Sequence, residues 1–163
     1  MNPKPLRNSC VTLPRFRIRN SQSVFHILGL DHVVLRVKDT PRVVRFYCEA
    51  LGCRVERERP ELGLIQLRAG QSLIDLVSVD GEIGRAGGAA PGVEGRNMDH
   101  LCLRVEPFDA GAIASHLLAH GVVPGETKPR YGAEGLGPSL YVSDPEGNTV
   151  ELKGPPESGR RAD

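Results

Sequence analysis

A seven-residue phrase occurs twice in this chain, and the repeat constrains the fold more than any other feature. Residues 31–37 read DHVVLRV and residues 99–105 read DHLCLRV, so five of the seven positions are identical. In each copy apolar side chains recur at every second position, which is the period of a β-strand with one buried face. A strand that is written twice predicts a duplicated structural unit.

The residues after the first copy predict a helix followed by short strands. Thr40 and Pro41 are typical of a helix start, and Gly52 is a typical stop. Turn residues then separate apolar runs that predict strands within residues 53–58, 63–69 and 72–79.

The same order follows the second copy. Asp109 is expected to cap a helix that stops at Gly121, and strands are expected within residues 122–128, 138–143 and 148–154. The sequence therefore predicts an α+β fold of two tandem βαβββ modules, residues 29–80 and 97–154. Together they would form a half-open, mostly antiparallel sheet cavity with helices on its outer face.

The segments outside the modules have a different composition. Residues 1–28 carry five basic residues and no acid, which is typical of a mitochondrial or plastid transit peptide. A flexible tail, or extra residues translated upstream of the true start, would have the same composition. Residues 80–97 are rich in glycine and alanine and predict a linker or lid, and residues 155–163 are expected to be a loose tail.

Composition excludes several classes of function. Lysine plus arginine number 21 against 20 for aspartate plus glutamate, so neither a nucleic-acid partner nor an acidic membrane surface is indicated. No apolar run approaches the roughly 18 residues that a membrane span needs. The four cysteines form no CxxC pair, which favours reduced thiols and a cytoplasmic protein.

The strand period also assigns a sheet face to each side chain. His32 and His100 are expected on the open face, away from the helices, and the same count places Asp75 and Glu151 there. The alternate positions face the helices: Val33, Leu35, Val37, Ile74, Leu76, Leu101, Leu103, Val105, Val150 and Leu152. Two histidines and up to two carboxylates on an open sheet predict a divalent-metal site with room for water or substrate.

Other candidate side chains have weaker patterns. His116 and His120 are spaced i, i+4 on the second helix, but without a third ligand they are interpreted as a solvated face. Cys102 is expected to line the pocket beside His100. Arg85, Arg130 and Tyr131 are expected in two glycine-rich loops, from which they could hold an anionic group.

Four motifs resemble the vicinal oxygen chelate superfamily, which includes glyoxalase I, fosfomycin-resistance proteins, methylmalonyl-CoA epimerase, extradiol dioxygenases and bleomycin-resistance proteins. They are DHVVLRV, FYCEALG, MDHLCLRV and YVSDPEGNTVEL, and the resemblance covers residues 29–154. It implies that His32, His100 and Glu151 bind one divalent ion (Zn, Ni, Mn, Co or Fe), with Asp75 at a fourth position. Most members have glutamate, glutamine or histidine there, so the shorter aspartate is a departure.

The favoured function is a glyoxalase-like lyase or isomerase, in which Asp75 or Glu151 would move a proton between adjacent carbons. An extradiol dioxygenase would use the same ligands, and Tyr141 matches that family's active-site tyrosine, but no remaining histidine is placed for its catalytic role. The resemblance also leaves open a fosfomycin-type thiol transferase and a non-catalytic drug-binding protein.

The expected partners are a small-molecule substrate, with a thiol adduct among the candidates, and a second copy of the chain. Half-open sheets leave edges and apolar surface that a second copy can cover. The resemblance likewise implies a homodimer whose cavities combine modules of two chains.

Overall fold

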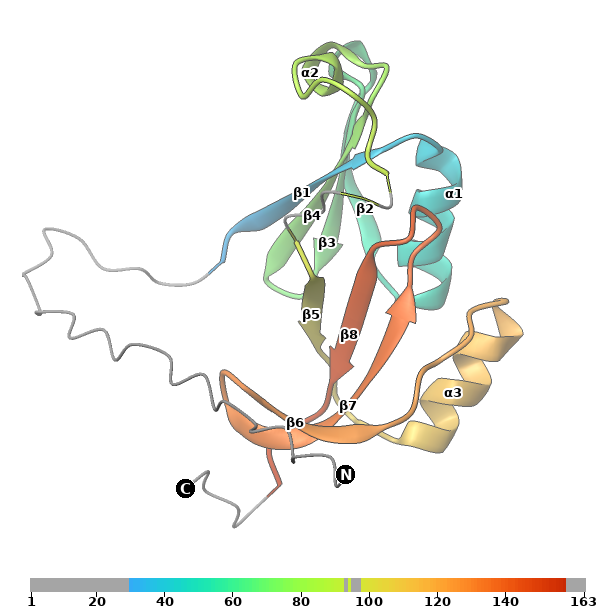
Figure 1. Ribbon diagram of the computed structural model, residues 1–163, viewed down its shortest axis with the longest axis vertical. Coiled ribbons are helices and arrows are strands. Elements are labelled where there is room, and N and C mark those ends of the chain that lie inside the picture. Colours follow the sequence, from blue (N-terminus) through green and yellow to red (C-terminus); the bar gives the residue numbers. More distant parts are fainter. Residues whose placement is uncertain (1–29, 93, 95–97, 158–163) are drawn as a thin grey trace, which may run out of the picture.

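The structure is a computed structural model that describes residues 30–92, 94 and 98–157, and that part of the chain forms two similar modules (Figure 1). Each module contains one four-stranded sheet of mixed direction and a helix that packs on it. The predicted α+β fold of two tandem βαβββ modules is therefore confirmed. The predictions for residues 1–28 and 158–163 lie outside the described residues.

The first module begins with the first copy of the repeated phrase. Its elements are β1 (His32–Val37), α1 (Thr40–Arg45), the π-helical η1 (Phe46–Ala50), β2 (Arg54–Arg59), the short 3-10 helix η2 (Pro60–Leu62), β3 (Leu64–Ala69), β4 (Ser72–Ser78) and the short α2 (Glu82–Arg85). The strand order is β1-β4-β3-β2, in which β1 and β4 are parallel and the other neighbours are antiparallel.

The second module repeats this arrangement. Its elements are β5 (His100–Arg104), α3 (Ala110–Ala119), β6 (Lys128–Gly132), β7 (Gly135–Ser143) and β8 (Thr149–Lys153). The order β5-β8-β7-β6 again pairs the first and last strands in parallel. Each module thus has its histidine-bearing strand at one edge of its sheet.

Both predicted helices have the expected ends. The side chain of Asp39 accepts from Arg42 N at 3.1 Å, and that of Asp109 accepts from Ala112 N at 3.0 Å. Gly52 and Gly121 follow the helices with φ of +74° and +73°, a conformation that glycine adopts without steric cost. The widening of the first helix into the π-helical η1 was not predicted from the sequence.

The strand predicted within residues 122–128 is wrong. Pro124 and Gly125 interrupt that segment, and β6 begins only at Lys128. Residues 129–132, which were expected to lie in a loop, continue this strand and pair with β7 across the two-residue turn of Ala133 and Glu134. Arg130 therefore lies on a strand, where its position is fixed by the sheet.

The apolar side chains assigned to the helix-covered faces form the core. Within β1 and β4, Val37 and Leu76 are fully buried, and Val150 of β8 is equally inaccessible. Buried residues from both modules belong to one continuous cluster. The faces predicted from the period of two are therefore confirmed for the core residues.

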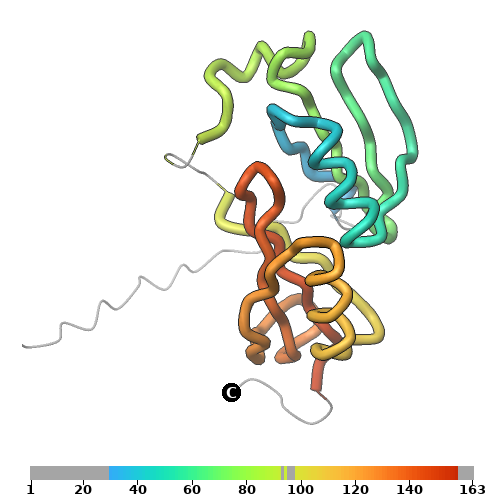
Figure 2. The backbone as a smooth tube through the Cα atoms, turned by 90° about the vertical axis from the view of Figure 1, so that its right-hand side faces the viewer, coloured from blue at the N-terminus to red at the C-terminus, as the bar shows by residue number. Residues whose placement is uncertain are grey.

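The turn between β7 and β8 connects the two modules. Tyr47 of η1 donates its hydroxyl to Asp144 Oδ2 at 3.2 Å. Glu146 Oε1 accepts from the backbone amides of Lys38 and Asp39 at 2.9 and 2.8 Å, where α1 begins. Figure 2 shows this turn beside the first module. The backbone amides of Lys38 and Asp39 and the buried hydroxyl of Tyr47 thus find their hydrogen-bond acceptors in the other module.

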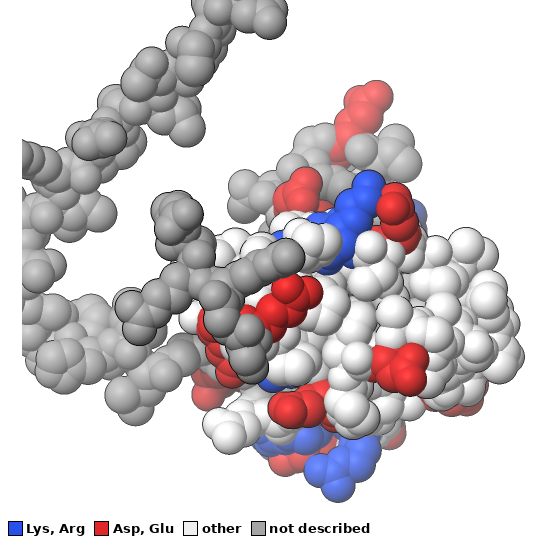
Figure 3. Space-filling model, turned by 90° about the horizontal axis from the view of Figure 1, so that it is seen from below, with Lys and Arg blue, Asp and Glu red and all other residues white. Residues whose placement is uncertain are grey.

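Charged side chains of both signs are interspersed on the face of the second module seen in Figure 3, and much of its described surface is uncharged. In the described part of the chain, no helix is long and apolar enough to cross a membrane.

Tyr47→Phe should destabilise the protein by about 1 to 2 kcal/mol, because buried Asp144 loses a donor. Burial raises the pKa of Tyr47, so the phenol remains a proton donor at all ordinary pH values. The exposed Tyr131 offers a matched control, and Tyr131→Phe should change the free energy of unfolding by only a few tenths of a kcal/mol. Urea unfolding of both variants tests this, and equal midpoints would contradict the inter-module role.

Candidate metal centre

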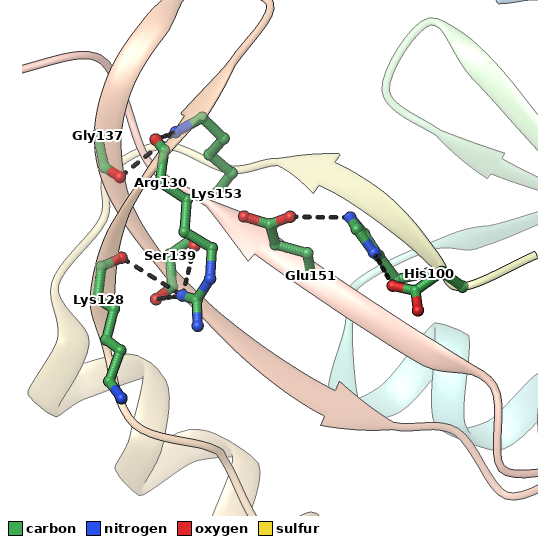
Figure 4. A network of polar contacts seen from close by, with 8 residues as sticks. His100, Lys128, Arg130, Gly137, Ser139, Glu151 and Lys153 are labelled. Carbon is green, nitrogen blue, oxygen red and sulfur yellow. Dashed lines mark hydrogen bonds and ion pairs between the residues drawn. The ribbon is translucent and has the colours of Figure 1, made fainter. Parts of the chain in front are cut away.

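His100 and Glu151 form the clearest ligand pair. The parallel register pairs Cys102 with Glu151, which places His100 and Glu151 on one face of adjacent strands. His100 Nε2 lies 3.2 Å from Glu151 Oε2, and Figure 4 shows the carboxylate extending from β8 toward the imidazole. Nitrogen and oxygen ligands at about 2.1 Å from an ion lie roughly 3.0 to 3.4 Å apart, so this separation suits a shared cation.

An aspartate orients each histidine. His100 Nδ1 contacts Asp99 Oδ1 at 2.7 Å, and His32 Nδ1 contacts Asp31 Oδ1 at the same distance. The hydrogen bond with Asp31 raises the pKa of His32, and the negative charge of Asp75 adds to this effect. A carboxylate on Nδ1 leaves Nε2 free to face a ligand, which is the usual arrangement of metal-binding histidines. The Asp-His dipeptide is visible twice in the sequence, but this role of the aspartates was not predicted from it.

Glu151 carries an unsatisfied oxygen. The residue is only 5% exposed, and Oε1 has no hydrogen-bond partner among the described residues. A buried carboxylate oxygen without a partner is costly, and a divalent cation bound there would offset that cost. The donor set of His100 and Glu151 therefore fits a divalent ion.

Asp75 occupies the equivalent position in the first module but is differently surrounded. Its register partners are Val34 on β1 and Gln66 on β3, so it takes the predicted face beside His32. It is only 6% exposed, and both carboxylate oxygens accept from Gln66 Nε2, at 3.1 and 3.0 Å. Gln66 was not identified from the sequence, although its place opposite Asp75 follows once β3 and β4 are aligned.

The four predicted ligands occur as two pairs in one chain. Within the described residues, no three His, Cys, Asp or Glu side chains lie close enough together to hold one metal ion. His32 and His100 nevertheless both line a cavity of about 700 Å³ between the modules. Each module thus supplies one half of the predicted ligand set.

Tyr141 lies beside the candidate ligand pair of the second module, His100 and Glu151. It is the register partner of Glu151, and its ring meets the His100 ring edge-on with centroids 5.4 Å apart. The guanidinium of Arg130 lies over the same ring, with Cζ 4.3 Å from the centroid. The ring of Tyr141 therefore lies between the candidate metal ligand His100 and the positively charged side chain of Arg130.

The remaining candidates have other roles. Partial desolvation and the negative charge of Glu151 raise the pKa of the exposed Cys102 to about 11, so the neutral thiol suits a lining residue and not a nucleophile. His116 Nε2 contacts Ala50 O at 3.1 Å and His120 Nδ1 contacts His116 O at 2.9 Å. Both histidines are exposed, as expected for a solvated face, and each also contacts a backbone carbonyl oxygen.

The chain matches the Glyoxalase/Bleomycin resistance protein/Dioxygenase superfamily over residues 29–152. It belongs to this superfamily. The match spans both modules, in agreement with the family resemblance of the repeated motifs.

Solved structures of the same fold include proteins of different kinds. An integron cassette protein from the mobile metagenome of V. cholerae is 28% identical, with a TM-score of 0.63 over 81% of this chain and 98% of that chain. Virulence protein STM3117 from Salmonella typhimurium is 27% identical, with a TM-score of 0.65 over 80% of this chain and 99% of that chain. Lactoylglutathione lyase from Agrobacterium tumefaciens is 16% identical, with a TM-score of 0.58 over 78% of this chain and 94% of that chain. At this identity the likeness shows the fold alone.

Proposed function

We propose that the protein is a divalent-metal-dependent lyase or isomerase of the glyoxalase type, acting on a small substrate that presents two neighbouring oxygens. The observation that carries this proposal is the pair of His100 and Glu151, whose Nε2 and Oε2 lie 3.2 Å apart, with a buried Oε1 of Glu151 that has no hydrogen-bond partner among the described residues. A bound divalent cation (Zn, Ni, Mn, Co or Fe) would supply Lewis-acid stabilisation of negative charge on the substrate oxygens.

The ligand set is completed by a second copy of the chain. His32 of one copy would join His100 and Glu151 of the other as ligands, with Asp75 of the first copy beside the cation, since one described chain gathers no group of three ligands. β1 and β5 are both edge strands, and Val34 beside His32 is 51% exposed. An open edge with an exposed apolar side chain is a surface that pairing would cover.

Asp75 would move the proton. Glyoxalase-type isomerisation transfers a proton between adjacent carbons, and a carboxylate near the site serves as the acceptor. Gln66 donates to both oxygens of Asp75, which holds the carboxylate in one orientation. Aspartate is shorter than the glutamate, glutamine or histidine implied at this position by the family resemblance, so Asp75 would stay near the cation without direct contact.

The same side chains argue against an extradiol dioxygenase. That chemistry requires a further histidine beside the metal, whereas His116 and His120 lie on α3 and at its end, with their ring nitrogens at backbone carbonyls. A drug-sequestering protein without a metal would leave the buried Glu151 oxygen unsatisfied.

The purified protein should bind one divalent ion per site. His32→Ala, His100→Ala and Glu151→Gln should each weaken metal affinity by more than about a hundredfold without unfolding the domain, because each removes a ligand and leaves the apolar core intact. Calorimetric titration of each variant with metal measures these affinities. His120→Ala is the matched histidine control and should bind metal as the unaltered protein does. Full metal content in both His32→Ala and His100→Ala would disprove the site.

The reaction class is tested on the metal-loaded protein with three substrates. We expect turnover of the methylglyoxal–glutathione hemithioacetal. Ring opening of a catechol would instead support a dioxygenase, and consumption of fosfomycin with a thiol would support a transferase. Tight drug binding by metal-free protein without turnover would contradict the enzymatic proposal.

Asp75→Asn should retain metal within about threefold and lower kcat by roughly a hundredfold to ten-thousandfold, because the amide cannot accept the proton. Glu151→Gln should lose both metal and turnover. Asp80→Asn, at an exposed aspartate after β4, is the control and should change neither. Unchanged turnover in Asp75→Asn would remove the base role and leave Glu151 as the carboxylate that acts.

A further inference from the structure

Arg130 is held rigidly on the face of the second sheet that carries Glu151. Its Nη1 donates to the backbone oxygen and the hydroxyl of Ser139, both at 2.9 Å, and reaches Lys128 O at 3.4 Å. The guanidinium plane is also supported by the ring of Tyr141. Figure 4 shows Arg130 and Ser139 on the other side of Glu151 from His100.

The other edge of this guanidinium is available to a ligand. In the part of the chain that the structure describes, Nε and Nη2 of Arg130 have no protein acceptor, and neither atom is buried. Other arginines on the sheets are engaged differently: Arg68 pairs with Glu56 and Arg104 pairs with Glu134. Arg130 thus keeps two parallel donors free, the fork that binds a carboxylate or phosphate bidentately.

A second cation increases the positive potential at this place. Lys153, two residues after Glu151 on β8, is 5% exposed and donates to Arg130 O at 2.6 Å and Gly137 O at 3.3 Å. Neither Arg130 nor Lys153 forms an ion pair with a carboxylate among the described residues. Two partly or fully buried positive charges without acidic partners attract an anion.

We infer that Arg130 selects substrates with an anionic group, a carboxylate or a phosphate, at the end remote from the metal-binding oxygens. Arg130 and His100 both contact the ring of Tyr141, so one aromatic ring separates the anion site from the metal ligand. A short, linear substrate can therefore reach both. This inference rests on the proposed metal-dependent function and adds the chemical class of the substrate.

Two hydroxamates separate the contributions of the metal and of Arg130. Acetohydroxamate offers only two neighbouring oxygens for a metal, whereas succinic monohydroxamate adds a carboxylate at the far end. Calorimetry on the metal-loaded protein should show at least about tenfold tighter binding of the succinic compound, because the free fork of Arg130 gains a charge-assisted pair. Arg130→Met keeps a stem over Tyr141 but removes the charge, so it should abolish this difference and leave acetohydroxamate affinity unchanged.

Two further variants complete the experiment. Arg130→Lys keeps the charge without the fork and should retain part of the difference, which keeps the test decisive if Arg130→Met fails to fold. Arg45→Met, at an exposed arginine at the end of α1, should behave as the unaltered protein. Equal affinity for both hydroxamates, or a difference that persists in Arg130→Met, would overturn the role of Arg130. Binding of neither hydroxamate would instead overturn the metal site and, with it, this inference.

Discussion

The parallel pairing of the first and last strands within each module determines where every candidate ligand lies. Because β1 pairs with β4 and β5 with β8, a histidine and a carboxylate from distant parts of the sequence share one face of adjacent strands. A shift of one residue would turn these side chains into the helix-covered core and expose the apolar set. The buried valines and leucines of the core therefore fix the register on which the polar site depends.

The two candidate ligand pairs, His32 with Asp75 and His100 with Glu151, differ in how their carboxylates are hydrogen-bonded, and the proposed roles rest on this difference. Asp75 receives the amide of Gln66 on both oxygens, whereas Glu151 shares one oxygen with His100 and leaves the other without a partner among the described residues. In the proposed function, a cation would stabilise the unpartnered oxygen of Glu151, and Asp75 would be the oriented carboxylate beside that cation. The β7–β8 turn, through Asp144 and Glu146, joins the same two modules on the helix side.

Sequence periodicity predicted the modules, the faces and the positions of both histidines, because an alternating strand and a capped helix are local patterns. It could not predict Gln66 opposite Asp75 or the hydrogen bonds of Ser139 with Arg130, since these depend on register between strands. The error at β6 has a similar cause: residues 128–132 are poor in apolar side chains and form a strand only because β7 pairs with them. Arg130 therefore lies on a strand, where pairing with β7 fixes its position.

Mixing His32→Ala chains with His100→Ala chains tests most directly whether each metal site combines modules of two copies. Each variant alone should bind almost no metal, because both of its cavities lack a ligand. After subunit exchange, one cavity of each mixed dimer regains all its ligands, so metal content should recover to about one quarter of that of the unaltered protein. If mixed dimers form and metal content does not recover, the ligands come from a single chain and the account is wrong.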